Sequence, residues 1–321
     1  MTEKRHSSST YIRFVRIITG LLAIICIFST GQNTQAVDFA YTINPITEKR
    51  EAIPLTYEYL YTIQLFGDYG MLNGAEEIFV TDDYNLYIAD TGNNRILRHN
   101  IKTSITEEFT HYDGTAFRSP EGVFVDTEGA IFVADTGNER VVHLDSQGNF
   151  VEWFGKPDSQ LLGPDFRFNP RKVIISSTGI IYTIKDQSIL QVDANNNFRG
   201  FLGSIRVDFS FQALLVRMFA TDEQKRRLGR TEPASYINFT LGPDGFLYAT
   251  SMDHRTGQIK KLNSIGKNIY PEKYFGELSY DENQIPIHPR FTGITVDHNG
   301  IVYVVESHSG RIYQYSGDGV L

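Results

Sequence analysis

The pattern A-D-T-G-N-x-R, which occurs twice, is the feature that most constrains how this chain folds. It begins at Ala89 in LYIADTGNNRILRHN and again at Ala134 in IFVADTGNERVVHLD, 45 residues later. A period of about 20 to 50 residues indicates a solenoid or a propeller, because each unit is one supersecondary element that buries its core only against its neighbours. We therefore expect the chain to be built from repeated units of one kind.

Five units align with this pattern, at residues 76–100, 120–145, 170–193, 236–263 and 291–316. Each has alternating apolar positions rich in Val, Ile and Tyr, which is typical of strands. Glu128-Gly129, Asp244-Gly245 and Asn299-Gly300 stand between the first and second strands, where a tight hairpin needs a positive φ. Further strand-like segments follow at residues 105–112, 150–155, 198–203 and 272–277. Four strands in about 40 to 45 residues are typical of a propeller blade, so we predict an all-β β-propeller.

The stretches YIADTGNNRI and FVADTGNERV resemble NHL repeats, and the likeness extends over residues 59–321. It implies four-stranded blades, five of them visible here, and six in the full product. The later stretches DANNNFRGFLGSIRV, ATDEQKRRLGRTEPASYIN and GRIYQYSGDGVL resemble a bacterial extracytoplasmic NHL-repeat subfamily. In that subfamily the chain continues through a last blade and C-terminal helical repeats, so the resemblance implies that this sequence is a fragment.

The N-terminus has the layout of a secretory signal over residues 1–36: a basic start, a short apolar run and a small residue at Ala36. A signal-anchored membrane protein, held by an uncleaved N-terminus, is the second choice. Removing residues 1–36 takes the net charge from −8 to −11, and removes the one cysteine, Cys26. An acidic surface repels phosphate backbones, so we expect a secreted or extracytoplasmic protein at the bacterial cell surface that binds no nucleic acid.

Three further segments have their own predictions. Residues 37–58 show no clear period and are predicted to be a linker before the propeller of residues 59–321. The strand-like segment Tyr59–Gly67 either completes the fifth unit, closing a five-bladed ring, or belongs to a missing sixth blade, which we favour. Residues 208–232 interrupt the repeat, and their apolar spacing predicts two short helices.

The residues of the repeated motif are predicted to be structural. In this interpretation Asp90, Asn93 and Arg95, with Asp135, Asn138 and Arg140, hold turns and neighbouring blades through hydrogen bonds and ion pairs. A ligand role is the alternative. The motif degenerates in the third and fifth units, which argues against one shared chemical function.

The position just before each first strand should point into the central channel. In chain order it is occupied by Glu76, Glu121, Arg171, Ile237 and Thr292. A mouth with two carboxylates and one guanidinium would suit a sugar, a small zwitterion or a divalent ion. A solvated rim with a Glu–Arg pair explains the same residues without a ligand.

An enzyme interpretation comes from the resemblance of this fold to metal-dependent lactonases of the gluconolactonase class. Those enzymes hold one divalent cation, such as calcium, through a Glu, an Asn and an Asp. Glu121 would be the glutamate and Asn238 the asparagine, whereas Thr292 and Gly293 stand where the aspartate is required. The set is incomplete, so the leading prediction is a binding or scaffold module without catalysis or cofactor, whose ligand is a protein or a carbohydrate.

Overall fold

The computed structural model describes residues 40–44, 47, 49–53, 61–159, 162, 166–202, 235–252, 257–270, 275–276, 279–280, 283–284 and 286–320. The chain divides into two compact units, Met1–Leu60 and Tyr61–Leu321, which are described separately. The predicted signal (residues 1–36) and the predicted helical insertion (208–232) lie outside the described residues. No helix in the described part has the length and hydropathy of a membrane span.

In its described residues the second unit contains five antiparallel sheets of three or four strands, confirming the predicted all-β propeller with five blades. The first three sheets are four-stranded, and the last two have three strands each in the described residues. The strands of the first three blades are β3(Glu77–Val80), β4(Asn85–Asp90), β5(Arg95–Asn100), β6(Thr106–Phe109), β9(Gly122–Val125), β10(Ile131–Asp135), β11(Arg140–Leu144), β12(Phe150–Phe154), β13(Val173–Ile175), β14(Ile181–Lys185), β15(Ser188–Val192) and β16(Phe198–Leu202). Those of the last two are β17(Tyr236–Leu241), β18(Leu247–Ser251), β19(Ile259–Leu262), β22(Phe291–Val296), β23(Val302–Glu306) and β24(Arg311–Tyr315).

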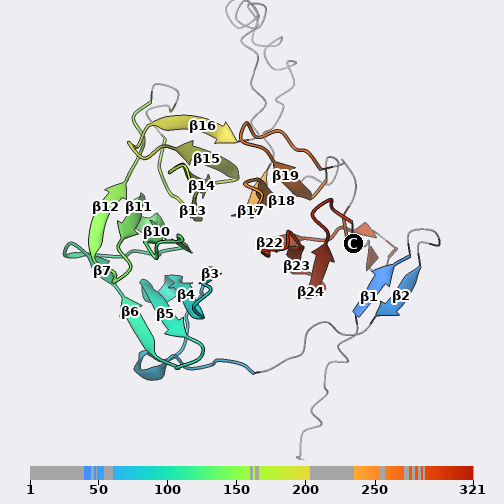
Figure 1. Ribbon diagram of the computed structural model, residues 1–321, viewed down its shortest axis with the longest axis horizontal. Coiled ribbons are helices and arrows are strands. Elements are labelled where there is room, and N and C mark those ends of the chain that lie inside the picture. The colour runs from blue at the N-terminus through green and yellow to red at the C-terminus, as the bar shows by residue number, and fades with distance from the viewer. Residues whose placement is uncertain are drawn as a thin grey trace, which may run out of the picture. The chain divides into compact units, whose positions relative to one another are not determined.

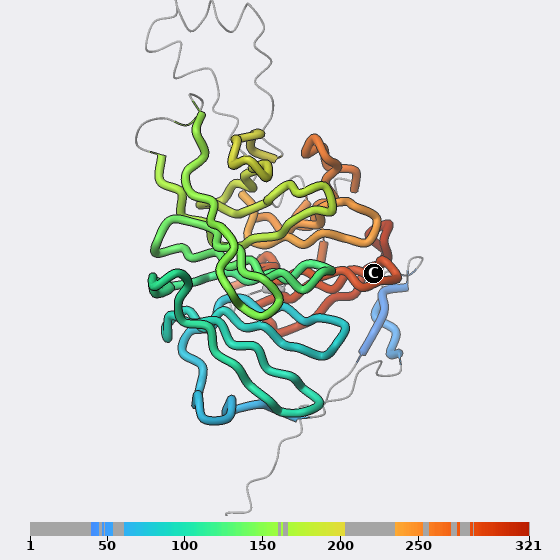
Figure 2. Tube along the Cα trace, turned by 60° about the vertical axis from the view of Figure 1, so that its left-hand side comes forward, coloured from blue at the N-terminus to red at the C-terminus, as the bar shows by residue number. Residues whose placement is uncertain are grey.

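Within this unit the sheets follow one another around a common centre in chain order (Figure 1). Strands β3, β13, β17 and β22 lie nearest the centre, and β6, β12 and β16 lie at the periphery. Figure 2 shows the same order from another side, as the colour passes from cyan through green and orange to red. Each blade therefore presents its first strand to the central channel.

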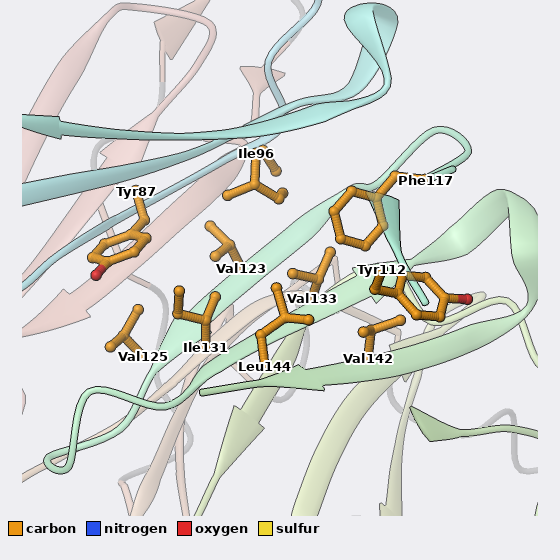
Figure 3. Close-up of a cluster of buried hydrophobic side chains, with 11 residues drawn as sticks. Tyr87, Ile96, Tyr112, Phe117, Val123, Val125, Ile131, Val133, Val142 and Leu144 are labelled. Atoms are coloured by element: carbon orange, nitrogen blue, oxygen red, sulfur yellow. The ribbon is translucent and has the colours of Figure 1, made fainter. Parts of the chain in front are cut away.

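The core lies between blades, because alternate side chains of a strand point to opposite faces of its sheet. Between the first two blades, Tyr87 and Ile96 of one pack with Val123, Val133 and Val142 of the other, and all five are at most 5% exposed (Figure 3). Similar clusters lie between the later neighbouring blades. Every blade consequently depends on the blade beside it for burial of its apolar face.

The hairpin turns have the backbone that their sequence predicts. Gly129, Gly245 and Gly300 have φ values of +87°, +77° and +79°, which favour glycine. Asp126 and Asp297 begin two of these turns, and in each the carboxylate Oδ1 accepts hydrogen bonds from two backbone N–H groups of its own turn. These local bonds fix the turns and hence the register of the first two strands.

One prediction about residues before the first blade was wrong. Of the predicted strand Tyr59–Gly67, the described residues 61–66 form no strand. Phe66 instead packs on Ile88 and Leu97, on the side of the first blade away from the second, and a short 3-10 helix, Gly67–Tyr69, follows. The apolar contact with the first blade outweighs the strand-like alternation of this segment.

The predicted linker, residues 37–58, contains an antiparallel hairpin of β1(Ala40–Ile43) and β2(Arg50–Ile53). The two strands are too short to show a period.

Two other short hairpins lie outside the blades: β7(His111–Tyr112) with β8(Thr115–Ala116), and β20(Ser279–Tyr280) with β21(Pro286–Ile287). In the predicted fourth strand at residues 272–277, the described residues Phe275 and Gly276 are not in a strand.

Candidate functional site: the motif turns and the channel mouth

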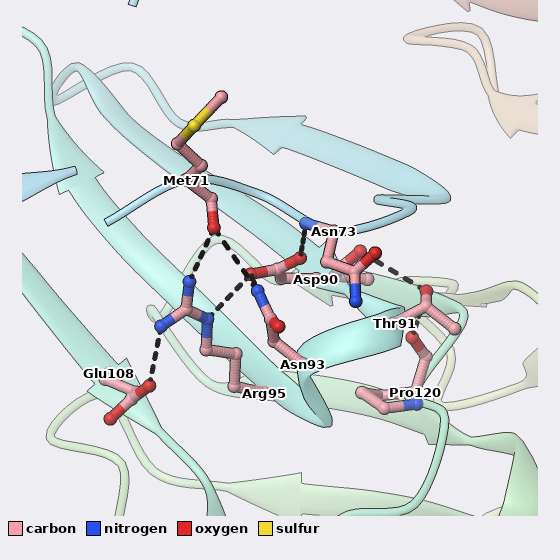
Figure 4. Close-up of polar contacts among 9 residues, drawn as sticks. Met71, Asn73, Asp90, Thr91, Asn93, Arg95, Glu108 and Pro120 are labelled. Atoms are coloured by element: carbon pink, nitrogen blue, oxygen red, sulfur yellow. Dashed lines mark hydrogen bonds and ion pairs between the residues drawn. The ribbon is translucent and has the colours of Figure 1, made fainter. Parts of the chain in front are cut away.

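In the first blade, the motif forms a buried polar network around Asp90 (Figure 4). Its carboxylate is 0% exposed and accepts hydrogen bonds from the backbone N–H of Asn73 (2.7 Å), Nδ2 of Asn93 (2.8 Å) and Nε of Arg95 (2.6 Å). The Arg95 guanidinium also reaches Glu108 Oε1 at 2.9 Å. The network joins β4, β5 and β6 to the segment that enters the first strand.

The second blade repeats this arrangement around Asp135, which is also 0% exposed. Asp135 accepts from the backbone N–H of Arg118 (2.8 Å), Nδ2 of Asn138 (2.7 Å) and Nε of Arg140 (3.2 Å). Burial raises the pKa of Asp135, and the hydrogen bonds from Arg118 and Asn138 oppose this rise. In both blades the motif asparagine donates through Nδ2 to the motif aspartate.

The motif also connects neighbouring blades. The hydroxyl of Thr91 donates to the carbonyl oxygen of Pro120, at the entrance to the second blade, at 2.7 Å. The hydroxyl of Thr136 donates in the same way to Pro170, at the entrance to the third blade, at 2.6 Å. Each motif thus fixes both its own incoming segment and that of the next blade.

A close backbone approach explains the motif glycine. A Cβ on Gly92 would lie 2.5 Å from the carbonyl oxygen of Asn73, and one on Gly137 would lie 2.6 Å from that of Arg118. In each case the glycine N–H donates to that same oxygen at 2.8 Å. Any side chain here would force the incoming segment away from the blade.

Glu306 occupies the motif-aspartate position in the fifth blade. It lies opposite Arg311 in the register of the second and third strands, as Asp90 lies opposite Arg95 in the first blade. It is 2% exposed and accepts a bond from the backbone N–H of Arg290, just before β22, at 3.0 Å. Burial alone would raise the pKa of Glu306, but hydrogen bonds from Ser309, Arg290 and His308 lower it to about 2. A longer acid performs the same anchoring here.

The five predicted channel-mouth positions fall at one position of the repeat. In the first three blades, the backbone N–H of this residue donates to the carbonyl oxygen near the end of the second strand, and these residues are Glu76, Glu121 and Arg171. In the last two blades, Ile237 and Thr292 lie where the pairing of the first and second strands shifts register. The five residues therefore share one backbone position of the repeat.

Two contacts join the predicted mouth residues and their neighbours across blades. Arg171 Nε lies 2.8 Å from Glu121 Oε2, linking the second and third blades. Asn238 Nδ2 donates to the carbonyl oxygen of Thr292 at 3.0 Å, linking the fourth and fifth. Among the described residues, the exposed side chain of Glu76 makes no such contact.

A third link was missed from the sequence. Lys172 Nζ lies 2.7 Å from Glu77 Oε1, and their side chains are only 13% and 15% exposed. This pair connects the third blade to the first, past the second, where Gly122 has no side chain and lies against the backbone of Arg171 and Lys172. Only the ring arrangement brings these residues together, although each directly follows a predicted mouth residue.

Comparison with known proteins agrees with this architecture. Residues 62–160 match the family model described as SMP-30/Gluconolactonase/LRE-like region. Over these residues the β-propeller is similar to that family. The match covers the first two blades and fits the NHL-type likeness of the repeats. No curated protein sequence matches the chain significantly.

Several solved structures are similar to this propeller. A streptogramin B lyase is 17% identical over 76% of this chain and 68% of that chain, with a TM-score of 0.47. An inactive virginiamycin B lyase from Staphylococcus aureus is 14% identical over 87% and 77%, with a TM-score of 0.47. A protein of unknown function from Bacteroides caccae is 10% identical over 87% and 86%, with a TM-score of 0.49.

The mouth residues of this propeller do not fit a divalent cation. The carboxylate of Glu121 is already paired with the Arg171 guanidinium. The amide oxygen of Asn238 accepts the backbone N–H of Phe239 at 2.7 Å, and its nitrogen bonds Thr292. Within the described ranges, no group of three or more His, Cys, Asp or Glu side chains is placed to hold a metal. The two predicted ligands would have to give up these bonds to bind an ion.

Proposed function

We propose that this protein is an exported, non-catalytic β-propeller module that binds a protein or carbohydrate ligand at the channel mouth. The observation that carries the proposal is the Glu121–Arg171 pair, held at 2.8 Å between two neighbouring blades. The Arg171 side chain is 53% exposed and that of Glu121 is 23% exposed, so both still face solvent. Accessible groups of opposite charge on rigid strands suit recognition of a polar ligand.

The pair offers complementary chemistry within one small area. A guanidinium presents several N–H donors in a fixed plane, and a carboxylate offers acceptors, so together they match hydroxyl, carboxylate or amide groups. Glu121 directly precedes β9, and the Arg171 backbone is bonded to Ile184 of β14, which limits motion of both groups. Such preorganisation reduces the entropy that is lost when a ligand binds.

The test is a binding screen on the intact chain with two sets of probes: neutral and acidic oligosaccharides, and soluble cell-surface proteins. For a bound probe, Arg171→Gln should weaken affinity about tenfold or more, since a hydrogen bond to a charged group contributes roughly 1.5 to 3 kcal/mol. Arg199→Gln is the matched control, because Arg199 is similarly exposed and pairs with Asp193 on the outer strand side of the third blade. If Arg171→Gln and Arg199→Gln weaken affinity equally, or if neither variant weakens it, binding at the mouth is refuted.

The proposed location is outside the cytoplasm, at the bacterial cell surface, with a signal-anchored form as the second choice. It rests on the basic and apolar layout of residues 1–36 and on the acidic remainder of the chain. The same acidity supports the absence of a nucleic-acid partner. Fractionation of cells that produce the tagged full chain tests this location, and a cytoplasmic product would contradict it.

A metal-dependent hydrolase of the gluconolactonase class is the second candidate, favoured by the family match over residues 62–160. In that case Glu121 and Asn238 would contribute to a site for calcium or a similar ion, once released from their present bonds. Calcium would then raise the Tm of the wild type and not of Glu121→Gln, since a ligand that binds only the folded state stabilises it. Lactone hydrolysis that requires Glu121 would replace the binding-module proposal.

A further inference from the structure

The motif arginines of the first two blades have different surroundings. In the first blade, the Arg95 guanidinium contacts two carboxylates, those of Asp90 and Glu108. In the second blade, the Arg140 guanidinium contacts one carboxylate, that of Asp135, through Nε at 3.2 Å. Among the described residues, no hydrogen-bond acceptor meets the two Nη atoms of Arg140, although this side chain is only 17% exposed. The second guanidinium therefore keeps N–H donors that the first one uses.

A tryptophan stands where the first blade has its second acid. Glu108 lies on β6, opposite the residue two positions after Arg95. Trp153 lies on β12, opposite the residue two positions after Arg140. Glu108 and Trp153 are therefore equivalent, and each lies on the face of its sheet that carries the arginine. An indole offers no acceptor at its ring nitrogen, so the second blade lacks the second counter-ion.

The missing acid changes the electrostatics of the guanidinium. Burial lowers the pKa of Arg95, but the hydrogen bonds and charges of Glu108 and Asp90 outweigh burial and raise this pKa overall. Burial also lowers the pKa of Arg140, and here no second acid reverses the effect. An anion placed at Arg140 would offset the cost of burying its charge.

Aromatic rings border the Arg140 guanidinium. Its Cζ lies 4.6 Å from the ring centre of Tyr112, which belongs to the short hairpin before the second blade. Tyr112 is buried at one end of the cluster in Figure 3, and its ring stacks on Phe150. This side of the guanidinium therefore has a fixed aromatic boundary.

Trp153 leaves an aromatic surface open beside the same arginine. It is 54% exposed, and a Cβ on Gly155 would lie 2.6 Å from its Cζ3, so the indole lies against this glycine. Phe154 lies opposite Val141, and Gly155 and Arg140 are the next positions along the two strands. The indole therefore extends along the sheet toward the guanidinium.

We infer that Arg140 and Trp153 form a second binding site, on the outer part of the second blade, for a sugar that carries a carboxylate, such as a uronic acid. The Nη atoms of Arg140 bind the carboxylate as a bidentate pair. The indole of Trp153 packs against the C–H face of the sugar ring. Strand β12 lies at the periphery of the propeller (Figure 1), so this site is separate from the channel mouth and does not rest on the proposed function.

A carboxylated sugar fits both features of the site. An acidic side chain of a peptide would satisfy the guanidinium, as Glu108 does in the first blade, but would leave the exposed indole uncovered. A neutral sugar would cover the indole but would leave the guanidinium without a counter-ion. The ligand therefore needs a ring and a negative charge in one molecule.

The probes are trimers of galacturonic, glucuronic and mannuronic acid, each compared with the neutral trimer of the matching sugar. Binding to the full chain is followed by calorimetry and by the fluorescence of Trp153, the one tryptophan of the chain. We expect a saturable fluorescence change with at least one acidic trimer. Its affinity should be at least about tenfold higher than that of the neutral counterpart, because only the acid pairs with the guanidinium.

Trp153→Glu gives the second blade the acid that Glu108 provides in the first. The new carboxylate should pair with Arg140, leave the Tm unchanged or higher, and weaken calorimetric binding of the acidic trimer at least about tenfold. Trp153→Ala adds no charge and should also weaken binding. Ile265→Glu is the matched control for added charge, because Ile265 is 68% exposed in a turn of the fourth blade, and it should leave binding unchanged.

Four results would overturn this site. Binding of no acidic trimer would refute it outright, and equal affinity for acidic and neutral trimers would refute recognition of the carboxylate. Tighter binding of triglutamate than of every acidic trimer would make the occupant a peptide. Loss of binding in Arg171→Gln, with none in Trp153→Glu, would place the sugar at the channel mouth and support the proposed function instead.

Discussion

Replacing Asp90 with alanine tests whether the repeated motif holds the blades together. The carboxylate is 0% exposed and accepts three hydrogen bonds, one of them from the Arg95 guanidinium at 2.6 Å. Removing one partner of a buried ion pair costs about 3 to 5 kcal/mol, because the other charge stays buried. Arg95 retains Glu108 Oε1 at 2.9 Å and the carbonyl oxygen of Met71 at 3.2 Å, so we expect the lower end, about 3 kcal/mol.

The assay is equilibrium denaturation in urea followed by the fluorescence of Trp153, the one tryptophan of the chain. A thermal melt followed by the same fluorescence should show a Tm lowered by about 6 to 12 °C, since 1 kcal/mol shifts the Tm of a domain of this size by roughly 2 to 4 °C. Asp82→Ala, at an exposed position in the same blade, should change stability by less than about 0.5 kcal/mol. Asp82→Ala therefore controls for the loss of an acidic side chain that is not buried.

A double-mutant cycle with Arg95→Met isolates the ion pair from the rest of the network. If Asp90 and Arg95 act as one unit, the double variant should be less destabilised than the sum of the single variants. A loss below about 1 kcal/mol for Asp90→Ala, or strict additivity in the cycle, would refute the structural role. Unchanged stability combined with lost ligand binding would instead assign the motif to the binding site.

Three further changes test other contacts. Gly137→Ala places a Cβ 2.6 Å from the Arg118 carbonyl oxygen, so it should destabilise by more than about 1 kcal/mol in urea denaturation. Thr91→Val removes a bond between blades and should cost about 1 kcal/mol in the same assay. Glu306 has a folded pKa of about 2 against 4.5 for the free group, so its contribution of about 3 kcal/mol is present above pH 4.5 and lost as the pH falls toward 2. Stability of wild type and Glu306→Gln, measured from pH 7 to pH 2.5, should therefore converge on acidification.

Each of these changes has a control or a contrary outcome. Gly293→Ala has only ordinary contacts at 3.4 Å and should be tolerated better than Gly137→Ala. Thr91→Ser keeps the hydroxyl and should restore most of the stability lost in Thr91→Val. A constant difference between wild type and Glu306→Gln across the pH range would show that the acid is not held ionised in the folded state.

Much of the fold could be predicted because a blade is local. Strand alternation, the glycine turns and the fourth strands near residues 105–112, 150–155 and 198–203 all follow from short-range patterns, and all are present. The segment Tyr59–Gly67 could not be predicted, because its fate depends on Phe66 packing against Ile88 and Leu97 of a sheet that forms later in the chain. Alternation alone does not distinguish a strand from a chain lying across a blade.

The candidate site also has one part that local sequence patterns predict and another part that they do not. The phase of Glu121, Arg171 and Thr292 came from aligning repeats, and the structure places all three at one register position. The Glu77–Lys172 pair joins the first blade to the third, 95 residues apart. No local periodicity specifies such a contact, since it depends on the diameter of the ring and on the missing side chain of Gly122. The partner of each side chain across the channel is therefore set by how the first strands are arranged around it.

The degeneration of the motif along the chain has a different meaning once the register is known. In the sequence, the change from D-T-G-N in the second blade to E-S-H-S in the fifth argues against a shared function. In space, Asp135 and Glu306 both accept the backbone N–H of the residue that leads into the first strand, Arg118 in one blade and Arg290 in the other. An anchoring role tolerates exchange of Asp for Glu, because the entering segment can shift to meet the longer side chain. Reacting groups need fixed positions, so this exchange favours anchoring over chemistry at the motif. It agrees with our proposal that a ligand binds at the channel mouth and not at the motif acid.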